Sequence, residues 1–199
     1  MKSTGRSSLR RAVFMDRDGT ISEEVGYVNH PSRYRVFPYS AEAVRLLNRE
    51  GWLAVLVTNQ AGVARGYFDE EMIGSVHNLL KSELERGGAR LDAIYYCAHH
   101  PSVGQAPYRL DCDCRKPKPG LIRRAAEEMA IDLSRSWMVG DRYSDIELAR
   151  NAGVRACFVL SGYGRGEWEY QRDSWSTEPD LLAEDLLEAV RKITEMDER

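Results

Sequence analysis

The chain has 199 residues, of which 43% are hydrophobic, and a formal net charge of −3 with an isoelectric point near 5.9. This length and apolar content support one sizeable core, and the charge does not favour nucleic acid as a partner. No apolar run approaches the roughly 20 residues of a membrane-spanning helix. Residues 1–11 are polar and basic, and we expect them to form a disordered tail. They lack the apolar stretch of a secretory signal, so we expect a cytoplasmic protein, and we expect it to be a monomer.

Short apolar runs alternate along the chain with segments of helical periodicity. The runs have the length of buried strands, and the periodic segments repeat apolar residues three and four positions apart, as helices do. The expected strands are residues 12–15, 52–57, 93–97, 137–139 and 155–160, and the expected helices are residues 40–50, 70–86, 120–130, 146–151 and 179–196. Residues 98–118 and 161–179 show no such periodicity and are expected to form long loops.

This alternation predicts an α/β fold, with a Rossmann-like, three-layer parallel sheet that carries helices on both faces. We expect a single domain over residues 12–199 without a large cap, because the gaps between the motifs are short. In such sheets the ligand binds beyond the carboxyl ends of the strands. Asp16, Thr58, Cys97 and Asp141 all stand at or just after an expected strand end, so the sequence predicts one site at that edge.

The first expected strand ends in Asp16-Arg17-Asp18-Gly19-Thr20. A DxDG sequence alone also occurs as a solvated turn, but a carboxylate at a strand tip beside a hard cation is a suitable nucleophile toward phosphorus. The second carboxylate, Asp18, can protonate the leaving oxygen and later accept a proton from water. Mg²⁺ suits such a site because it prefers oxygen ligands and bridges carboxylates to phosphate.

A second acidic pair follows the strand expected at residues 137–139. Asp141 is a candidate second carboxylate for the metal, and Asp145 a candidate partner that orients the ligands. Two further residues could hold phosphate: Thr58 follows the second strand, and Lys116 precedes an expected helix. Neutralising the charge on the transferring phosphoryl group is the main catalytic demand of this chemistry, so both are candidate catalytic groups.

These motifs, in this order, resemble the haloacid dehalogenase superfamily of phosphohydrolases: DxDGT, a strand-end Thr, a Lys before a helix and GDxxxD. The resemblance covers most of the chain. It implies that Asp16 is the nucleophile, that Asp18 is the general acid and base, and that Thr58 and Lys116 stabilise the phosphoryl group. It also implies that Asp16, Asp141 and the backbone carbonyl of Asp18 hold magnesium.

Cysteines and histidines cluster ahead of Lys116. Three thiols and one imidazole make a complete tetrahedral zinc set, and these are Cys97, His99, Cys112 and Cys114. Three free thiols are the alternative reading, and disulfides are not expected without an export signal. We therefore predict a structural zinc that orders the loop before Lys116, with His100 left as an ordinary loop residue.

The loop sequence narrows the resemblance. Cys-Ala-His-His-Pro and Cys-Asp-Cys-Arg-Lys-Pro-Lys-Pro-Gly, with residues 26–28 and 59–68, resemble the D-glycero-D-manno-heptose 1,7-bisphosphate 7-phosphatase family. The resemblance implies removal of the C7 phosphate from this small sugar bisphosphate, in nucleotide-activated heptose biosynthesis, with neither nucleic acid nor a membrane as partner. The implied substrate contacts are Glu24, Val25, Gly26, Tyr27, Asn59, Gln60, Ala61, Arg115 and Arg142.

Two positions depart from that family pattern: Ala61 stands where Ser is common, and Arg142 replaces the usual Lys but keeps its charge. Histidinol-phosphate phosphatases share the zinc loop, but residues 64–68 and 115–120 fit them less well. Another alternative is a capless phosphatase for a large partner such as a nucleic-acid end, although no basic aromatic groove is evident. The cations around Lys116 exceed what one phosphoryl group needs, which predicts preference for a bisphosphate.

Overall fold

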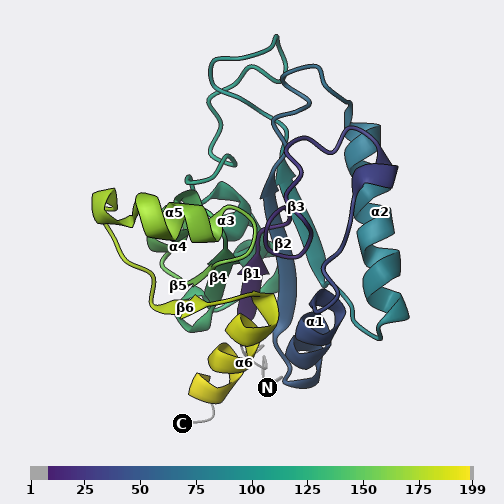
Figure 1. Ribbon diagram of the computed structural model, residues 1–199. Helices are drawn as coiled ribbons and strands as arrows, with labels where there is room; N and C mark the ends of the chain where they lie inside the picture. Colours follow the sequence, from purple (N-terminus) through teal and green to yellow (C-terminus); the bar gives the residue numbers. More distant parts are fainter. Residues whose placement is uncertain (1–8, 198–199) are drawn as a thin grey trace, which may run out of the picture.

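The computed structural model describes residues 9–197, and a six-stranded parallel sheet runs through its centre (Figure 1). Because these strands are apolar and largely buried, they form a sheet that is covered on both faces. In spatial order the strands are β3 (Ala93–Cys97), β2 (Leu53–Asn59), β1 (Ala12–Met15), β4 (Trp137–Gly140), β5 (Arg155–Val159) and β6 (Leu181–Ala183). The expected parallel α/β architecture is confirmed.

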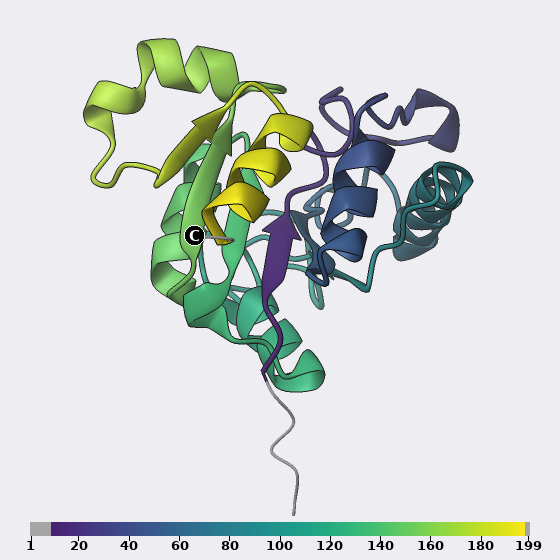
Figure 2. The same ribbon diagram turned by 90° about the horizontal axis from the view of Figure 1, so that it is seen from below.

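Helices cover both faces of the sheet. Because successive side chains of a strand point to opposite faces, the hydrophobic core has two parts, one on each face. Val13 and Met15 lie in a core with α1 (Ser40–Arg49), α2 (Glu70–Arg86) and α6 (Leu186–Asp197). Ala12 and Phe14 lie in the opposite core with α3 (Gly120–Met129), α4 (Tyr143–Ala152) and α5 (Gly164–Tyr170). Helix α6 packs beside α1, as the view from below shows (Figure 2). Short 3₁₀ helices occur at Pro31–Arg33, Leu133–Arg135 and Arg172–Ser174.

The helix expected over residues 179–196 is wrong in its first part. Residues 181–183 instead form β6, which pairs with β5 from Cys157 to Val159, and only then does α6 begin. Asp180 anchors this edge strand, since its Oδ2 accepts a hydrogen bond from the Ala156 amide at 2.7 Å. Leucines with helical spacing therefore form a strand, because the edge of β5 offers backbone hydrogen-bond partners to this segment.

The loop expected over residues 161–179 is also wrong in part, because it contains α5 and a 3₁₀ helix. Tyr143 stacks on Trp175 with ring centroids 4.8 Å apart, and Trp168 also packs beside Trp175. Helix α4 begins earlier than expected, at Tyr143, since Glu167 of α5 accepts a hydrogen bond from the Tyr143 amide at 2.7 Å. Tertiary contacts therefore order a segment that lacks a periodic sequence signal.

The sheet order reverses between β1 and β4, and the carboxyl ends of these two neighbours meet at one edge. Residues 98–118 rise beyond this edge (Figure 1). Most of the tail expected at residues 1–11 lies outside the described residues, but Arg10 already pairs with Ile131. None of the described helices has the length and apolar character needed to cross a bilayer.

Candidate active site

Three carboxylates and one ammonium group meet where β1 and β4 end. Asp16 follows β1, Asp141 follows β4 and Asp145 lies in the first turn of α4, with carboxylate oxygens of all three within 4.8 Å of one another. Lys116 Nζ lies 2.8 Å from Asp16 Oδ2 and 2.8 Å from Asp145 Oδ1. All four side chains are buried, so the topology brings together acidic residues that are far apart in the sequence.

The charge of this cluster is unbalanced, because a single ammonium faces three carboxylates. Burial raises the pKa of Asp16 to about 6, although Lys116 acts in the opposite direction. Burial, followed by the charges of Asp16 and Asp145, raises the pKa of Asp141 well above its ordinary value. A divalent cation would remove this repulsion, and oxygen donors are the ligands that Mg²⁺ takes. The donor set therefore fits a magnesium ion.

Two glycines of the sequence motifs make room for these carboxylates. Gly19 has φ of +83°, and a Cβ atom at this position would collide with the carboxylate of Asp141. A Cβ atom on Gly140 would collide with the carboxylate of Asp145. Gly19 is thus required by the close approach of the two acidic motifs, and Gly140 by the close packing of Asp145 within its own motif.

Asp18 is held by a buried network. Arg17, only 2% exposed, donates to both Asp18 oxygens, from Nε at 3.0 Å and from Nη2 at 2.7 Å. Gln60 Nε2 donates to Asp18 Oδ2 at 3.1 Å and to Thr58 Oγ1 at 2.9 Å. Arg17 Nη2 also donates to Gln60 Oε1 at 2.9 Å. Asp18 and Thr58, both predicted as catalytic, are therefore linked through Gln60.

Asn59 has a role that sequence reasoning missed. Its Oδ1 accepts a hydrogen bond from the Lys116 amide at 3.1 Å, and its Nδ2 donates to the Lys116 carbonyl at 3.2 Å. These two bonds fix the backbone of the residue whose ammonium contacts Asp16. An amide directly after a strand-end Thr offers no sequence signal for this role, because its partner lies 57 residues away.

A cavity of about 350 Å³ opens beside the acidic cluster. Its lining contains every residue predicted as catalytic and all predicted substrate contacts except Val25, which packs against the core instead. Ser144 also lines it and was not predicted. The lining comprises Asp16, Asp18, Glu24, Gly26, Tyr27, Thr58, Asn59, Gln60, Ala61, Arg115, Lys116, Arg142 and Ser144.

Two guanidinium groups line this cavity in addition to Lys116. Arg115 Nη1 donates to the His99 carbonyl at 3.2 Å. Arg142 Nε forms an ion pair with Glu167 Oε1 at 2.9 Å. The cavity therefore presents more cationic side chains than one phosphoryl group needs. The sequence did not indicate that Glu167 would contact one of them.

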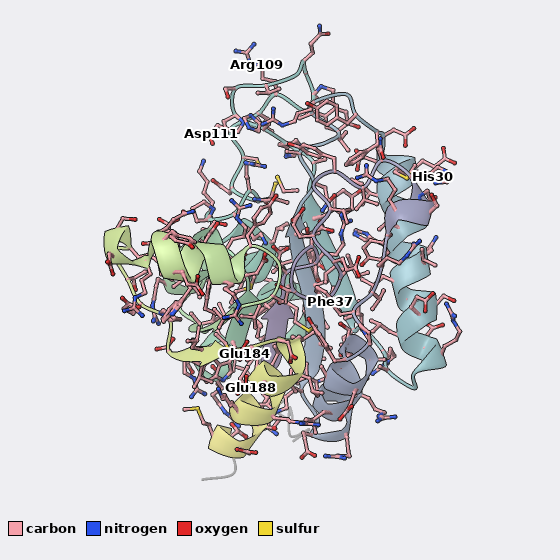
Figure 3. All side chains as sticks on the ribbon, in the orientation of Figure 1. His30, Phe37, Arg109, Asp111, Glu184 and Glu188 are labelled. Atoms are coloured by element: carbon pink, nitrogen blue, oxygen red, sulfur yellow. The ribbon has the colours of Figure 1, made fainter. Side chains whose placement is uncertain are left out.

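The Cys/His cluster has assembled at the base of the loop that follows β3. The Sγ atom of Cys114 lies 3.2 Å from that of Cys97 and 3.0 Å from that of Cys112, and His99 Nδ1 lies 3.4 Å from Cys114 Sγ. His100 lies outside this cluster, and its Nδ1 instead accepts hydrogen bonds from two loop amides. Figure 3 labels Arg109 and Asp111 on the part of the loop farther from the sheet. Four converging donors of this kind could hold a tetrahedral zinc ion.

Comparison with known proteins places these features in one family. The HAD-hydrolase-like family model matches residues 113–189. The D-glycero-beta-D-manno-heptose-1,7-bisphosphate 7-phosphatase of Haemophilus influenzae is 38% identical over 180 residues, which are 87% of this chain and 97% of that protein. The D-glycero-D-manno-heptose-1,7-bisphosphate 7-phosphatase of Thermosynechococcus vestitus is 43% identical over 190 residues, 92% of this chain and 95% of that protein.

Solved structures show the same relationship. The D,D-heptose 1,7-bisphosphate phosphatase from B. bronchiseptica, complexed with magnesium and phosphate, superposes with a TM-score of 0.83 at 30% identity. The alignment covers 94% of this chain and 99% of that one. The corresponding enzyme from Burkholderia thailandensis gives a TM-score of 0.68 at 26% identity, covering 92% of this chain and 97% of the other.

Proposed function

The chain belongs to the D-glycero-D-manno-heptose 1,7-bisphosphate 7-phosphatase family of haloacid dehalogenase-like phosphatases, and from this premise we propose that it removes the C7 phosphate of that bisphosphate through an aspartyl-phosphate on Asp16. The observation that carries the proposal is the buried cluster in which Lys116 contacts Asp16 directly, beside a cavity lined by further cations.

In the first step an Asp16 carboxylate oxygen attacks phosphorus while the bond from phosphorus to the C7 oxygen breaks. Asp18 donates a proton to that leaving oxygen. In the second step Asp18 takes a proton from water, whose oxygen attacks the phosphorus and releases Asp16 and inorganic phosphate. The Lys116 ammonium and the Thr58 hydroxyl hold the phosphoryl oxygens during both steps.

Two metals are part of this proposal. Magnesium, held by Asp16, Asp141 and the Asp18 carbonyl, would neutralise negative charge on the transferring phosphoryl group. Asp145 is engaged by Lys116 at 2.8 Å, and its Oδ2 accepts a hydrogen bond from the Arg142 amide at 3.2 Å, so it orients its neighbours rather than completing the ligand set. Zinc at the Cys/His cluster has a structural role, because four protein donors leave no position for water.

The test compares the wild-type protein with Asp16→Asn on a panel of phosphorylated metabolites that includes both anomers of the heptose bisphosphate and histidinol phosphate. We expect magnesium-dependent release of phosphate from the heptose bisphosphate, and no measurable turnover by the variant, because a carboxamide is a very poor nucleophile of nearly the same size. An unfolding temperature and a phosphate affinity like those of the wild type would show that the variant is folded.

Three results would contradict the proposal. Appreciable turnover by Asp16→Asn would mean that water attacks phosphorus directly. Preference for histidinol phosphate, or for a phosphorylated nucleic-acid end, would assign the site to a different substrate. Turnover that is unaffected by chelation of magnesium would remove the metal from the reaction.

A further inference from the structure

We propose that Glu167 and Tyr163 are positioning residues that set the guanidinium of Arg142 for the phosphate that the substrate keeps, which makes residues 161–170 a specificity-determining segment. This inference rests on the proposed function, because it states how that site recognises the second phosphate of its substrate. It also gives a role to a segment that lies outside the motifs of the sequence.

Glu167 is a carboxylate with both oxygens engaged. It is 7% exposed, its Oε1 lies 2.9 Å from Arg142 Nε, and its Oε2 accepts a hydrogen bond from the Tyr143 amide at 2.7 Å. The Tyr143 amide belongs to the first turn of α4, where amides have no partner within the helix and where negative charge is favoured. The carboxylate is therefore held firmly beside Arg142.

Tyr163 holds the same guanidinium from another side. Arg142 Cζ lies 4.5 Å from the centroid of the Tyr163 ring, within the range of a cation–π contact. The backbone that carries this ring is anchored, because the Tyr163 amide donates to Asp141 Oδ2 at 2.9 Å and Ser161 Oγ donates to the Gly19 carbonyl at 2.6 Å. The segment that carries Tyr163 is thus attached to both acidic motifs.

This arrangement leaves the outer end of Arg142 available. Glu167 faces Nε, and no hydrogen bond joins Nη1 or Nη2 to another of the residues that the structure describes. The side chain is 47% exposed and lines the cavity together with Arg115. A guanidinium fixed at Nε presents a preset pair of donors, which matches the geometry of a phosphate, whereas a lysine ammonium offers only a point charge.

The experiment measures kcat and KM of Glu167→Gln and Tyr163→Leu on the heptose bisphosphate and on p-nitrophenyl phosphate, which has no second phosphate. For Glu167→Gln we expect KM for the bisphosphate to rise about 5- to 20-fold, with kcat nearly unchanged and no change on p-nitrophenyl phosphate, because binding of a non-reacting group is lost. Tyr163→Leu should raise the same KM about 2- to 5-fold.

A double-mutant cycle tests whether Glu167 acts through Arg142. In an Arg142→Met background, Glu167→Gln should have no further effect on KM for the bisphosphate. Asp180→Asn is the matched control, since Asp180, like Glu167, pairs with an arginine (Arg150, at 2.8 Å) and accepts a hydrogen bond from a backbone amide, but does not line the cavity. It should leave KM unchanged.

The inference is overturned if Glu167→Gln weakens both substrates equally, if it lowers activity further in the Arg142→Met background, or if Asp180→Asn has the same effect. Competition against p-nitrophenyl phosphate turnover separates this result from the proposed function. If the wild type does not hydrolyse the heptose bisphosphate, but Glu167→Gln still raises the inhibition constant of fructose 1,6-bisphosphate and not of fructose 6-phosphate, then only the assigned substrate fails.

Discussion

Arg115 connects the Cys/His cluster to the cavity by a single side chain. It follows Cys114 directly, donates to the carbonyl of His99, and lines the cavity beside Lys116. Its neighbour Lys116 contacts two carboxylates, so that ammonium is already engaged by the acidic cluster. Arg115 is therefore available for an anionic group other than the one that is transferred.

We predict that Arg115→Ala raises KM for the sugar bisphosphate about 10- to 100-fold, which corresponds to a charged hydrogen bond of roughly 1.5–3 kcal/mol. Activity on a monophosphate should change little, because that substrate lacks the second charge. The measurement is steady-state kinetics on both substrates, with zinc content checked for each protein. Arg124→Ala, an exposed arginine of α3 outside the cavity, serves as the control. Equal losses on both substrates would remove Arg115 from recognition of the second phosphate.

At the scale of elements, the two segments without periodic sequence bring functional groups to the sheet edge. Residues 98–118 are attached at the Cys/His cluster and by Tyr108, whose hydroxyl donates to Glu70 at the start of α2 at 2.8 Å. Gly104 packs so closely on the Ala64 carbonyl that a Cβ atom would collide with it. The loop therefore depends on a few contacts, of which the cluster is nearest to Lys116.

We predict that Cys112→Ser lowers activity and increases protease cleavage between residues 98 and 114, because the metal would no longer hold the loop. Displacing a catalytic group by about 1 Å can reduce the rate on the order of 100-fold. Elemental analysis should find one zinc per chain in the wild type and less in the variant, while magnesium still binds. His100→Asn is the control, since His100 lies outside the cluster, and it should keep the zinc. Absence of zinc from metal-replete wild-type protein would contradict the assignment.

At the scale of the whole molecule, a buried histidine connects folding stability to pH. His77 of α2 is 6% exposed and lies 3.5 Å from the guanidinium of Arg17. Burial, with the charges of Arg17 and Lys81, lowers the pKa of His77 to about 3. Below pH 6.5 the unfolded chain gains a proton at this residue that the folded chain excludes, so stability falls as the pH decreases from about 6.5 toward 3.

His77→Gln should remove this part of the pH dependence. Between pH 8 and pH 5 the wild type should lose about 2 kcal/mol more of its unfolding free energy than the variant does, since the slope is about 1.4 kcal/mol per pH unit below 6.5. Urea denaturation at both pH values measures the difference, and comparison of the two proteins cancels the opposite contribution of the buried carboxylates. His30→Gln, at an exposed histidine (Figure 3), should behave like the wild type. If the wild type and His77→Gln lose equal stability, the assigned shift is wrong.

The sequence by itself determined the class of fold and the group of candidate residues that the fold brings to one edge of the sheet. Apolar runs that end in Asp16, Thr58 and Asp141 predict strands, and parallel strands bring their carboxyl ends to one edge, so local pattern and one topological rule are enough to predict the site. The predicted cluster of Cys97, His99, Cys112 and Cys114 likewise depends on residue types close to one another in the chain.

Tertiary structure alone decided how these residues are held. The bonds from Asn59 to Lys116, from Gln60 to Asp18 and from Glu167 to Arg142 depend on packing rather than on residue spacing. The same is true of β6, where a strand edge supplied hydrogen bonds to residues whose leucines also suit a helix. Periodicity reports only which side of an element is buried, whereas the partner of a polar group is chosen by what the fold places beside it.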